Sequence, residues 1–149
     1  MRGFDLPIEV FDKFGRRYKL SFRPPVNANA YFNIKLWNEV DREVAELQFG
    51  EKFEKILFLD YICVVENCRC IGLGPALLVI IEDCGKQSQC SKILAHVRTF
   101  AYKPGEGVWL LNWYVKRGYK VIRIRNESDD PEYLGTVEKE LGAMTASQA

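Results

Sequence analysis

The sequence lacks the features that mark membrane-spanning, secreted and metal-binding proteins. It has no apolar run near the roughly 18 to 20 residues that cross a bilayer, and its first ten residues, MRGFDLPIEV, lack the apolar stretch of a secretion signal. We therefore expect a cytoplasmic protein with no membrane partner. The number of cysteines, 5, is odd, which fits free thiols in a reducing compartment better than a set of disulfides.

A zinc site is the sharper interpretation of these cysteines, but their spacing does not favour it. Cys68 and Cys70 are separated by one residue, whereas zinc knuckles usually place two to four residues between paired ligands. The single histidine, His96, lies on a different segment. We therefore expect no metal.

Charge gives no general indication of a partner. The chain has 21 Lys plus Arg against 20 Asp plus Glu, a net charge of +1, so no overall field attracts nucleic acid or an anionic membrane. One basic run lacks the interleaved aromatic residues of a nucleic-acid platform. It fits a solvated face, or a contact to a phosphate or an acidic substrate; its members are Lys116, Arg117, Lys120, Arg123 and Arg125.

Length and composition predict one globular domain over residues 1–149. A chain of 149 residues with 48% hydrophobic residues can bury about 70% of its unfolded surface in a single core. Residues from about 142 onward are expected to be a disordered tail.

The first half of the sequence predicts strands. Alternating apolar and polar residues, bounded by Gly, Pro and Asn, indicate Arg17 to Phe22, Tyr31 to Trp37 and Arg42 to Phe49, with Gly50 closing the third strand. The turn at Asn38 to Asp41 makes the second and third antiparallel neighbours. Lys55 to Val65 is almost continuously apolar, as expected of the central strand of a sheet covered on both faces.

Helices and strands alternate in the second half. Helical spacing of the apolar residues after Gly74, with Pro75 at the start and Gly85 and Lys86 at the end, favours a helix over the alternative of a buried strand through ALLVII. The remaining predicted elements are a strand at Lys92 to Arg98, a helix at Val108 to Lys116, a strand at Tyr119 to Arg125, and a strand or short helix at Tyr133 to Leu141. The fold class is therefore α/β or α+β, a mixed sheet with helices covering its faces.

The stretch between the central strand and the first helix is rich in glycine. Backbone amides at the start of a helix form a site for phosphate, and Gly72 and Gly74 let the chain approach an anion closely. The alternative is a turn that needs glycine only for its backbone angles. A kinase-type P-loop is excluded because no Lys-Ser or Lys-Thr follows, and a dinucleotide-binding turn fits poorly because Leu77 replaces its third glycine.

Two segments resemble the GCN5-related N-acetyltransferases, which bind acetyl-coenzyme A. Arg69 to Gly74 is similar to the Q/R-x-x-G-x-G/A signature of that family, and Tyr114 to Tyr119 is similar to its Y-x-x-x-G-F/Y signature. The order and separation of the two segments, with a helix and a strand between them, also resemble the family. The resemblance covers about Leu57 to Ile122 and implies a mixed, mostly antiparallel sheet flanked by helices.

The resemblance also implies how acetyl-coenzyme A would be held. Backbone amides of Cys70 to Gly74 would bind the pyrophosphate, and the strand edge at Ile62, Cys63 and Val64 would pair with the pantetheine arm. Pro75 removes one amide from this set, which would reduce affinity. The cofactor-binding positions implied are Ile62, Cys63, Val64, Arg69, Cys70, Ile71, Gly72, Leu73, Gly74 and Ala76.

For the chemistry, the resemblance implies that Tyr114 is the acid that protonates the thiolate leaving group. Phe58 stands where some protein-lysine acetyltransferases of the family have a catalytic Glu. Asp60 is two residues after Phe58 and would lie on the same face as Phe58 in an unbulged strand, so it is the substitute base. The alternative is that Asp60 is only a salt-bridged or partly solvated strand carboxylate. His96 could reach the cleft, although a lone strand His is more often structural, and Gly107 replaces an Asn that binds the arm in many relatives.

The function implied is transfer of an acetyl group from acetyl-coenzyme A to a primary amine. Only Arg23 to Ala30 joins the first two predicted strands, where relatives have two helices that roof the acceptor site. An open groove would suit a protein or peptide amine, as well as a small one, or would need a homodimer or another partner subunit to complete it. The alternative function is a catalytically weak or inactive domain that binds acyl-coenzyme A or a partner.

Overall fold

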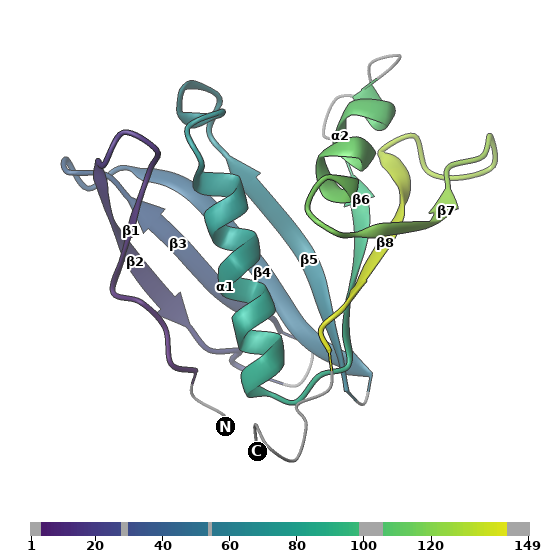
Figure 1. Ribbon diagram of the computed structural model, residues 1–149, viewed down its shortest axis with the longest axis horizontal. Helices are drawn as coiled ribbons and strands as arrows, with labels where there is room; N and C mark the ends of the chain where they lie inside the picture. Colours follow the sequence, from purple (N-terminus) through teal and green to yellow (C-terminus); the bar gives the residue numbers. More distant parts are fainter. Residues whose placement is uncertain (1–3, 28–29, 54, 99–105, 143–149) are drawn as a thin grey trace.

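The computed structural model describes residues 4–27, 30–53, 55–98 and 106–142, with the backbone alone for 52–53 and 106–108. Its elements form one sheet and two helices (Figure 1). The strands are β1 (Glu9–Phe11), β2 (Arg17–Arg23), β3 (Phe32–Trp37), β4 (Glu43–Phe53), β5 (Ile56–Val64), β6 (Lys92–Arg98), β7 (Lys120–Ile124) and β8 (Tyr133–Glu140). The helices are α1 (Leu73–Gln87) and α2 (Glu106–Val115), and a 3-10 turn, η1, spans Glu66–Cys68.

The sheet is mixed and mostly antiparallel, as the sequence predicts. Its eight strands run in the order β1-β2-β3-β4-β5-β6-β8-β7. Every neighbouring pair is antiparallel except β5 and β6, which are parallel and are connected through α1. Strand β8 inserts between β6 and β7, so the last two strands form an antiparallel pair at the far edge.

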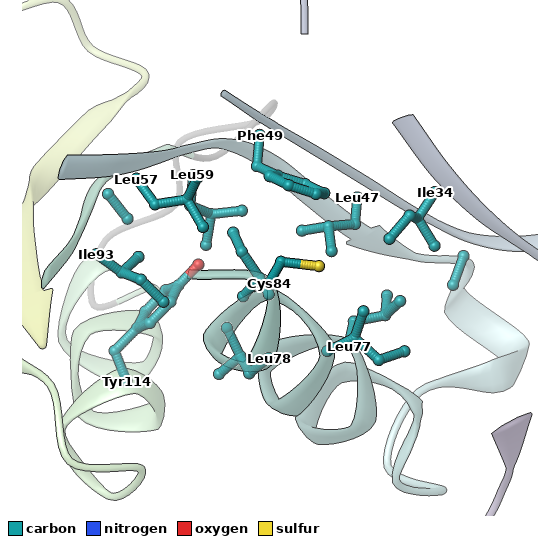
Figure 2. Packing of buried hydrophobic residues seen from close by; sticks show 14 of the residues in the cluster. Ile34, Leu47, Phe49, Leu57, Leu59, Leu77, Leu78, Cys84, Ile93 and Tyr114 are labelled. Carbon is teal, nitrogen blue, oxygen red and sulfur yellow. The ribbon is translucent and has the colours of Figure 1, made fainter. Parts of the chain in front are cut away.

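Both helices lie on one face of the sheet, and the apolar core lies between them and that face (Figures 1 and 2). Leu57 is paired with Ile93, and its side chain contacts the position of Gly85 on α1. Along β8, Gly135 faces Leu111 of α2 on the same side. The sequence predicted helices over both faces, whereas no helix of the described residues lies on the opposite face, hereafter the bare face.

Two glycines have roles that sequence patterns assigned incorrectly. Gly50 does not end its strand, because β4 continues to Phe53. A side chain at position 50 would be crowded, since its Cβ would lie 3.0 Å from Cδ1 of Tyr31. Gly85 does not end its helix: α1 continues to Gln87, and a Cβ on Gly85 would lie 2.5 Å from Cδ1 of Leu141. In both cases packing against a neighbour, rather than chain termination, selects glycine.

The connection between β2 and β3 is short. Among the described residues between Arg23 and Phe32 there is no helix, as predicted. The C-terminal segment predicted at Tyr133 to Leu141 forms the strand β8, Tyr133–Glu140, which decides the alternative left open by its sequence. In the described parts of the chain, no helix has both the length and the apolar character to cross a membrane. The predicted tail beyond Gly142 lies outside the described residues.

An additional strand, β1, forms a hairpin with β2, and a buried carboxylate fixes its turn. The Asp12 side chain is 0% exposed. It accepts hydrogen bonds from the amides of Phe14 (2.8 Å) and Arg16 (3.0 Å), from Nε of Arg16 (2.8 Å) and from the hydroxyl of Tyr18 (2.8 Å). Gly15 supplies the left-handed residue of the turn, with φ of 80°. The turn is therefore rigid.

These bonds predict an acid-sensitive contribution to stability. Burial acts to raise the pKa of Asp12, but the hydrogen bonds from Tyr18, Arg16 and Phe14 outweigh it and lower the pKa from 3.8 to about 2. Since the folded-state pKa is the lower one, the stabilisation is complete above about pH 4 and is lost as the pH falls through 2. Urea unfolding from pH 5 to pH 2 should show a free-energy advantage of the wild type over Asp12→Asn that shrinks with acidification. A constant difference between the two would contradict this assignment.

Candidate functional site

The two parallel strands separate partway along their length. Strands β5 and β6 pair from Ile56 with Lys92 to Leu59 with Ala95, and this pairing then ends. Strand β5 nevertheless continues to Val64, and β6 continues to Arg98. Figure 1 shows the two strands splaying apart beyond this point. The β6 side of β5 beyond Leu59 is therefore not covered by another strand of the described chain.

A bulge marks the place where the strands separate. Gln48 of β4 is paired with Tyr61 and the next residue, Phe49, is paired with Leu59, so Asp60 is the extra residue on β5. A bulge of this kind bends its strand and increases the local twist. We infer that the bulge turns the second half of β5 away from β6, because the parallel pairing stops at the same step.

The glycine-rich turn follows β5 and leads into α1. Two of its residues have left-handed backbone angles, Cys70 with φ of 63° and Gly72 with φ of 96°. Among the described residues, no acceptor is found for the five backbone amides from Cys70 to Gly74. A helix N-terminus with unpaired amides carries partial positive charge. The turn therefore has the donors that an anion needs.

Pro75 leaves the amides of Cys70 to Gly74 in place but supplies no amide of its own, so the start of α1 has one donor fewer. It is the third residue of α1, and the first amides of a helix have no partner within the helix. The first bonded amide is that of Ala76, which donates to the carbonyl of Gly72 at 3.2 Å. Ala76 therefore uses its amide within the helix, unlike the other predicted binding positions in the turn.

Arg69 braces the turn against the strand that precedes it. Its Nε donates to the carbonyl of Val64 at 3.0 Å, which ties the start of the turn to the end of β5. The side chains of Ile62 and Val64 pack against the core on the helix face. Cys63, between them, lies on the opposite face, as its pairing with Glu46 requires.

Helix α2 contacts the start of α1 through an aromatic residue that sequence patterns did not identify. A Cβ on Gly74 would lie 3.0 Å from Cζ2 of Trp113, so the Trp113 ring packs directly against this glycine. The Arg117 guanidinium lies over the same ring, 4.3 Å from its centroid. Gly74 is thus explained by helix packing as well as by the needs of an anion. The only available signal was the position of Trp113 beside Tyr114.

Tyr114 is buried beside the parting strands. It is 4% exposed, and Figure 2 shows its ring reaching from α2 to the core residues Leu59 and Ile93. Its hydroxyl makes no hydrogen bond to any described residue, although its ring contacts Trp113 and Tyr119 edge-on. Burial raises the pKa of this phenol, which keeps it protonated.

The other tyrosine of the same motif is satisfied within the protein. The hydroxyl of Tyr119 donates to Oε2 of Glu82 at 3.2 Å, and Lys139 donates to the second oxygen of the same carboxylate at 2.8 Å. Burial, followed by the charge of Glu82, raises the pKa of Tyr119. Of the two phenols, only Tyr114 therefore has a donor to offer.

The predicted position of Asp60 rested on an unbulged strand, and that premise is wrong. Because of the bulge, Phe58 and Tyr61, three residues apart, lie on the same face, paired with Gly50 and Gln48. Asp60 lies half-buried at the bulge itself. Phe58 is 6% exposed, and its ring contacts His96 edge-on at 5.2 Å between centroids.

The bare face of the sheet carries a polar network beside the parting strands. Glu46 accepts a hydrogen bond from Nδ2 of Asn33 at 2.8 Å. The Nζ of Lys35 lies 2.7 Å from Oε1 of Glu43 and 3.8 Å from Oε2 of Glu46. Burial, a hydrogen bond with Cys63 and these two carboxylates raise the pKa of Tyr61 to about 12. Two carboxylates thus share one lysine on this surface, and sequence patterns did not single them out.

The described residues give no group of ligands for a metal. Within the described residues, no cluster of three or more His, Cys, Asp or Glu side chains is arranged to hold an ion. Cys63 and Cys68 are half-buried and Cys70 is exposed, and none of the five cysteines forms a disulfide.

Comparison with known proteins establishes the fold. No protein-family model matches the sequence. An acetyltransferase of the GNAT family from Staphylococcus aureus superposes with a TM-score of 0.62 at 12% identity, over 79% of this chain and 72% of that one. The ribosomal-protein-S18-alanine N-acetyltransferase of Escherichia coli gives 0.60 at 18% identity, over 80% and 75%.

A third structure was solved with a ligand. The PaiA N-acetyltransferase of Thermoplasma acidophilum in complex with coenzyme A gives a TM-score of 0.54 at 15% identity, over 72% of this chain and 59% of that one. The resemblance inferred from two short motifs is therefore confirmed for the architecture. This chain has the fold of the GCN5-related N-acetyltransferases.

The geometry of the turn predicts different costs for its two glycines. Gly72→Ala should lower the free energy of unfolding by about 1–2 kcal/mol because an L-residue is strained at positive φ, while the added Cβ meets nothing closer than 3.7 Å. Gly74→Ala should instead cost stability through Trp113. Double-mutant cycles in urea should show coupling between Gly74 and Trp113 and none between Gly72 and Trp113. Coupling at Gly72 would show that packing, not backbone angle, selects that glycine.

Proposed function

We propose that this protein is an N-acetyltransferase that transfers an acetyl group from acetyl-coenzyme A to a primary amine. The observation that supports it most strongly is the parting of β5 from β6 with five unpartnered amides at the end of the exposed strand edge. An extended chain that ends in a diphosphate fits such an edge and such a turn. The shared fold of solved N-acetyltransferases agrees with this assignment.

The residues present fit the coenzyme. The amides of Cys70, Ile71, Gly72, Leu73 and Gly74 would hold the diphosphate. The backbone of Ile62, Cys63 and Val64 would pair with the pantetheine arm as an added strand would. Arg69 would act by fixing the turn to Val64. Bound acetyl-coenzyme A supplies the activated acetyl group, and the protein supplies position and proton transfer.

Tyr114 is the proposed proton donor to the departing thiolate. Its ring is buried, its raised pKa keeps the hydroxyl protonated, and no described residue accepts a hydrogen bond from that hydroxyl, so it can give one to sulfur at no cost to another contact. The amine that attacks must first lose a proton, which costs roughly 4 kcal/mol at neutral pH for a pKa near 10. Asp60, at the bulge where the strands part, is the proposed group that accepts this proton directly or through water.

The acceptor is proposed to approach the bare face of the sheet. The described part of the β2–β3 connection contains no helix to roof this surface, and Glu43 and Glu46 lie there with one lysine between them. An open, acidic surface can receive the amine of a protein or peptide, whereas a small molecule would need an enclosed pocket. A second copy of the chain or another subunit is the alternative means of closing the groove.

One observation favours a second candidate function, a catalytically weak or inactive domain that binds acyl-coenzyme A or a partner. Phe58 stands where related lysine acetyltransferases have a catalytic Glu, and its ring is buried against His96. Such a domain would keep the coenzyme site and lose turnover. The two functions differ in whether an acetylated amine is formed.

Ligand binding tests the proposed function directly. At 100 times the dissociation constant, acetyl-coenzyme A should stabilise the protein by about 2.7 kcal/mol, which raises the Tm by roughly 5–10 °C. Free coenzyme A should act similarly and NAD should not. The same preparation is then assayed for acetylation of a panel of amines and peptides. A response to NAD alone would reject the assignment, and binding without turnover would favour the second candidate.

Tyr114→Phe separates the catalytic role from the structural one. We expect turnover to fall by about 10²- to 10⁴-fold, as for the loss of a general acid, with affinity for coenzyme A and the free energy of unfolding nearly unchanged. Tyr119→Phe is the matched control: it removes the bond to Glu82 and should cost about 0.5–1.5 kcal/mol of stability while sparing turnover. Equal turnover in wild type and Tyr114→Phe would exclude Tyr114 as the acid.

A further inference from the structure

The hairpin of β1 and β2 contacts the turn that precedes α1. The amide of Lys13 donates to the carbonyl of Ile71 at 2.8 Å. A Cβ on Gly72 would lie 3.7 Å from the Lys13 nitrogen and 3.9 Å from its Cβ. The side chain of Lys13 therefore leaves the backbone directly beside the residues whose amides have no acceptor.

The position of Lys13 is fixed before any ligand binds. It follows Asp12, whose buried carboxylate holds the hairpin turn through the amides of Phe14 and Arg16 and the hydroxyl of Tyr18. A binding group on such a rigid turn does not require the backbone to become ordered. The flexible stem of the lysine still lets its ammonium group move by several ångströms.

The charge of Lys13 is not neutralised by the protein. No carboxylate of the described residues forms an ion pair with it, and its Nζ lies over the exposed ring of Phe14, 5.2 Å from the centroid. Arg16, on the same hairpin, is different because Asp12 holds its guanidinium at 2.8 Å. Lys13 is thus the cation of this turn that is available to an anion.

The turn before α1 lacks a charged group of its own. Its residues from Cys70 to Gly74 have no charged side chain, so they offer a diphosphate only the partial charges of their amides. Arg69, at the start of the turn, is engaged with the carbonyl of Val64. A diphosphate in the turn would therefore need a full positive charge from another element of the fold.

We infer that Lys13 supplies this charge and is a diphosphate-binding residue of the coenzyme site, contributed by the N-terminal hairpin. The inference rests on the proposed binding of acetyl-coenzyme A and adds the residue that neutralises the diphosphate. The coenzyme also carries a 3′-phosphate. Because the Lys13 backbone bonds to the turn whose amides would hold the diphosphate, we assign Lys13 to the diphosphate rather than to the 3′-phosphate.

Calorimetric titration of Lys13→Ala with acetyl-coenzyme A and with its dephospho form, which lacks the 3′-phosphate, tests the inference. We expect affinity for both ligands to fall by the same factor, about tenfold or more, as for the loss of a charge-assisted hydrogen bond. Lys13→Arg should retain most of the affinity. A loss confined to the form with the 3′-phosphate, or no loss, would overturn the inference.

Lys19→Ala is the matched control. Lys19 lies on the same hairpin and is exposed, but its Nζ is drawn to Asp41, 3.3 Å away at the β3–β4 turn. The Lys19→Ala variant should bind acetyl-coenzyme A and its dephospho form as tightly as the wild type does. A loss of affinity equal to that of Lys13→Ala would show a general charge effect and refute the role of Lys13. If the wild type binds neither ligand, the proposed function itself fails; if it binds both and Lys13→Ala binds equally well, only the role of Lys13 fails.

Discussion

Strands β5 and β6 share backbone hydrogen bonds only as far as Leu59 and Ala95, and the rest of the site follows from their separation. Parallel strands that part leave an edge whose amides and carbonyls have no partner strand, and such an edge either binds an extended ligand or risks aggregation. The bulge at Asp60 supplies the twist that separates the strands. The end of β5 leads into the α1 turn, and Trp113, beside Tyr114 on α2, packs against Gly74 of that turn.

Three contacts hold the turn before α1 in place. Arg69 ties the turn to β5, Lys13 ties it to the hairpin of β1 and β2, and Trp113 packs α2 against Gly74. None of these contacts uses the amides of Cys70 to Gly74. The site is therefore preorganised by contacts from sequence positions that are far apart.

The sequence allowed most of the elements to be predicted because their signals are local: alternation in β3, helical spacing in α1, and Gly-Pro at a helix start. The fold class and the two motifs with Tyr114 and Gly72 could also be found. What escaped prediction depends on tertiary contacts. No local pattern shows that Gly50 lies under Tyr31 or that Gly85 lies against Leu141. The bulge at Asp60 is set by its register with β4, which sequence alternation cannot reveal.

Because both helices lie on one face of the sheet, the side chains of the strands fall into two groups, one facing the helices and one on the bare face. Side chains toward the helices build the core, whereas those on the bare face, such as Glu43, Glu46 and Tyr61, contribute little to it. Substitutions at the exposed positions of that face can therefore accumulate at small cost to folding. A lineage with this architecture can rewrite one surface while the rest of the fold stays intact.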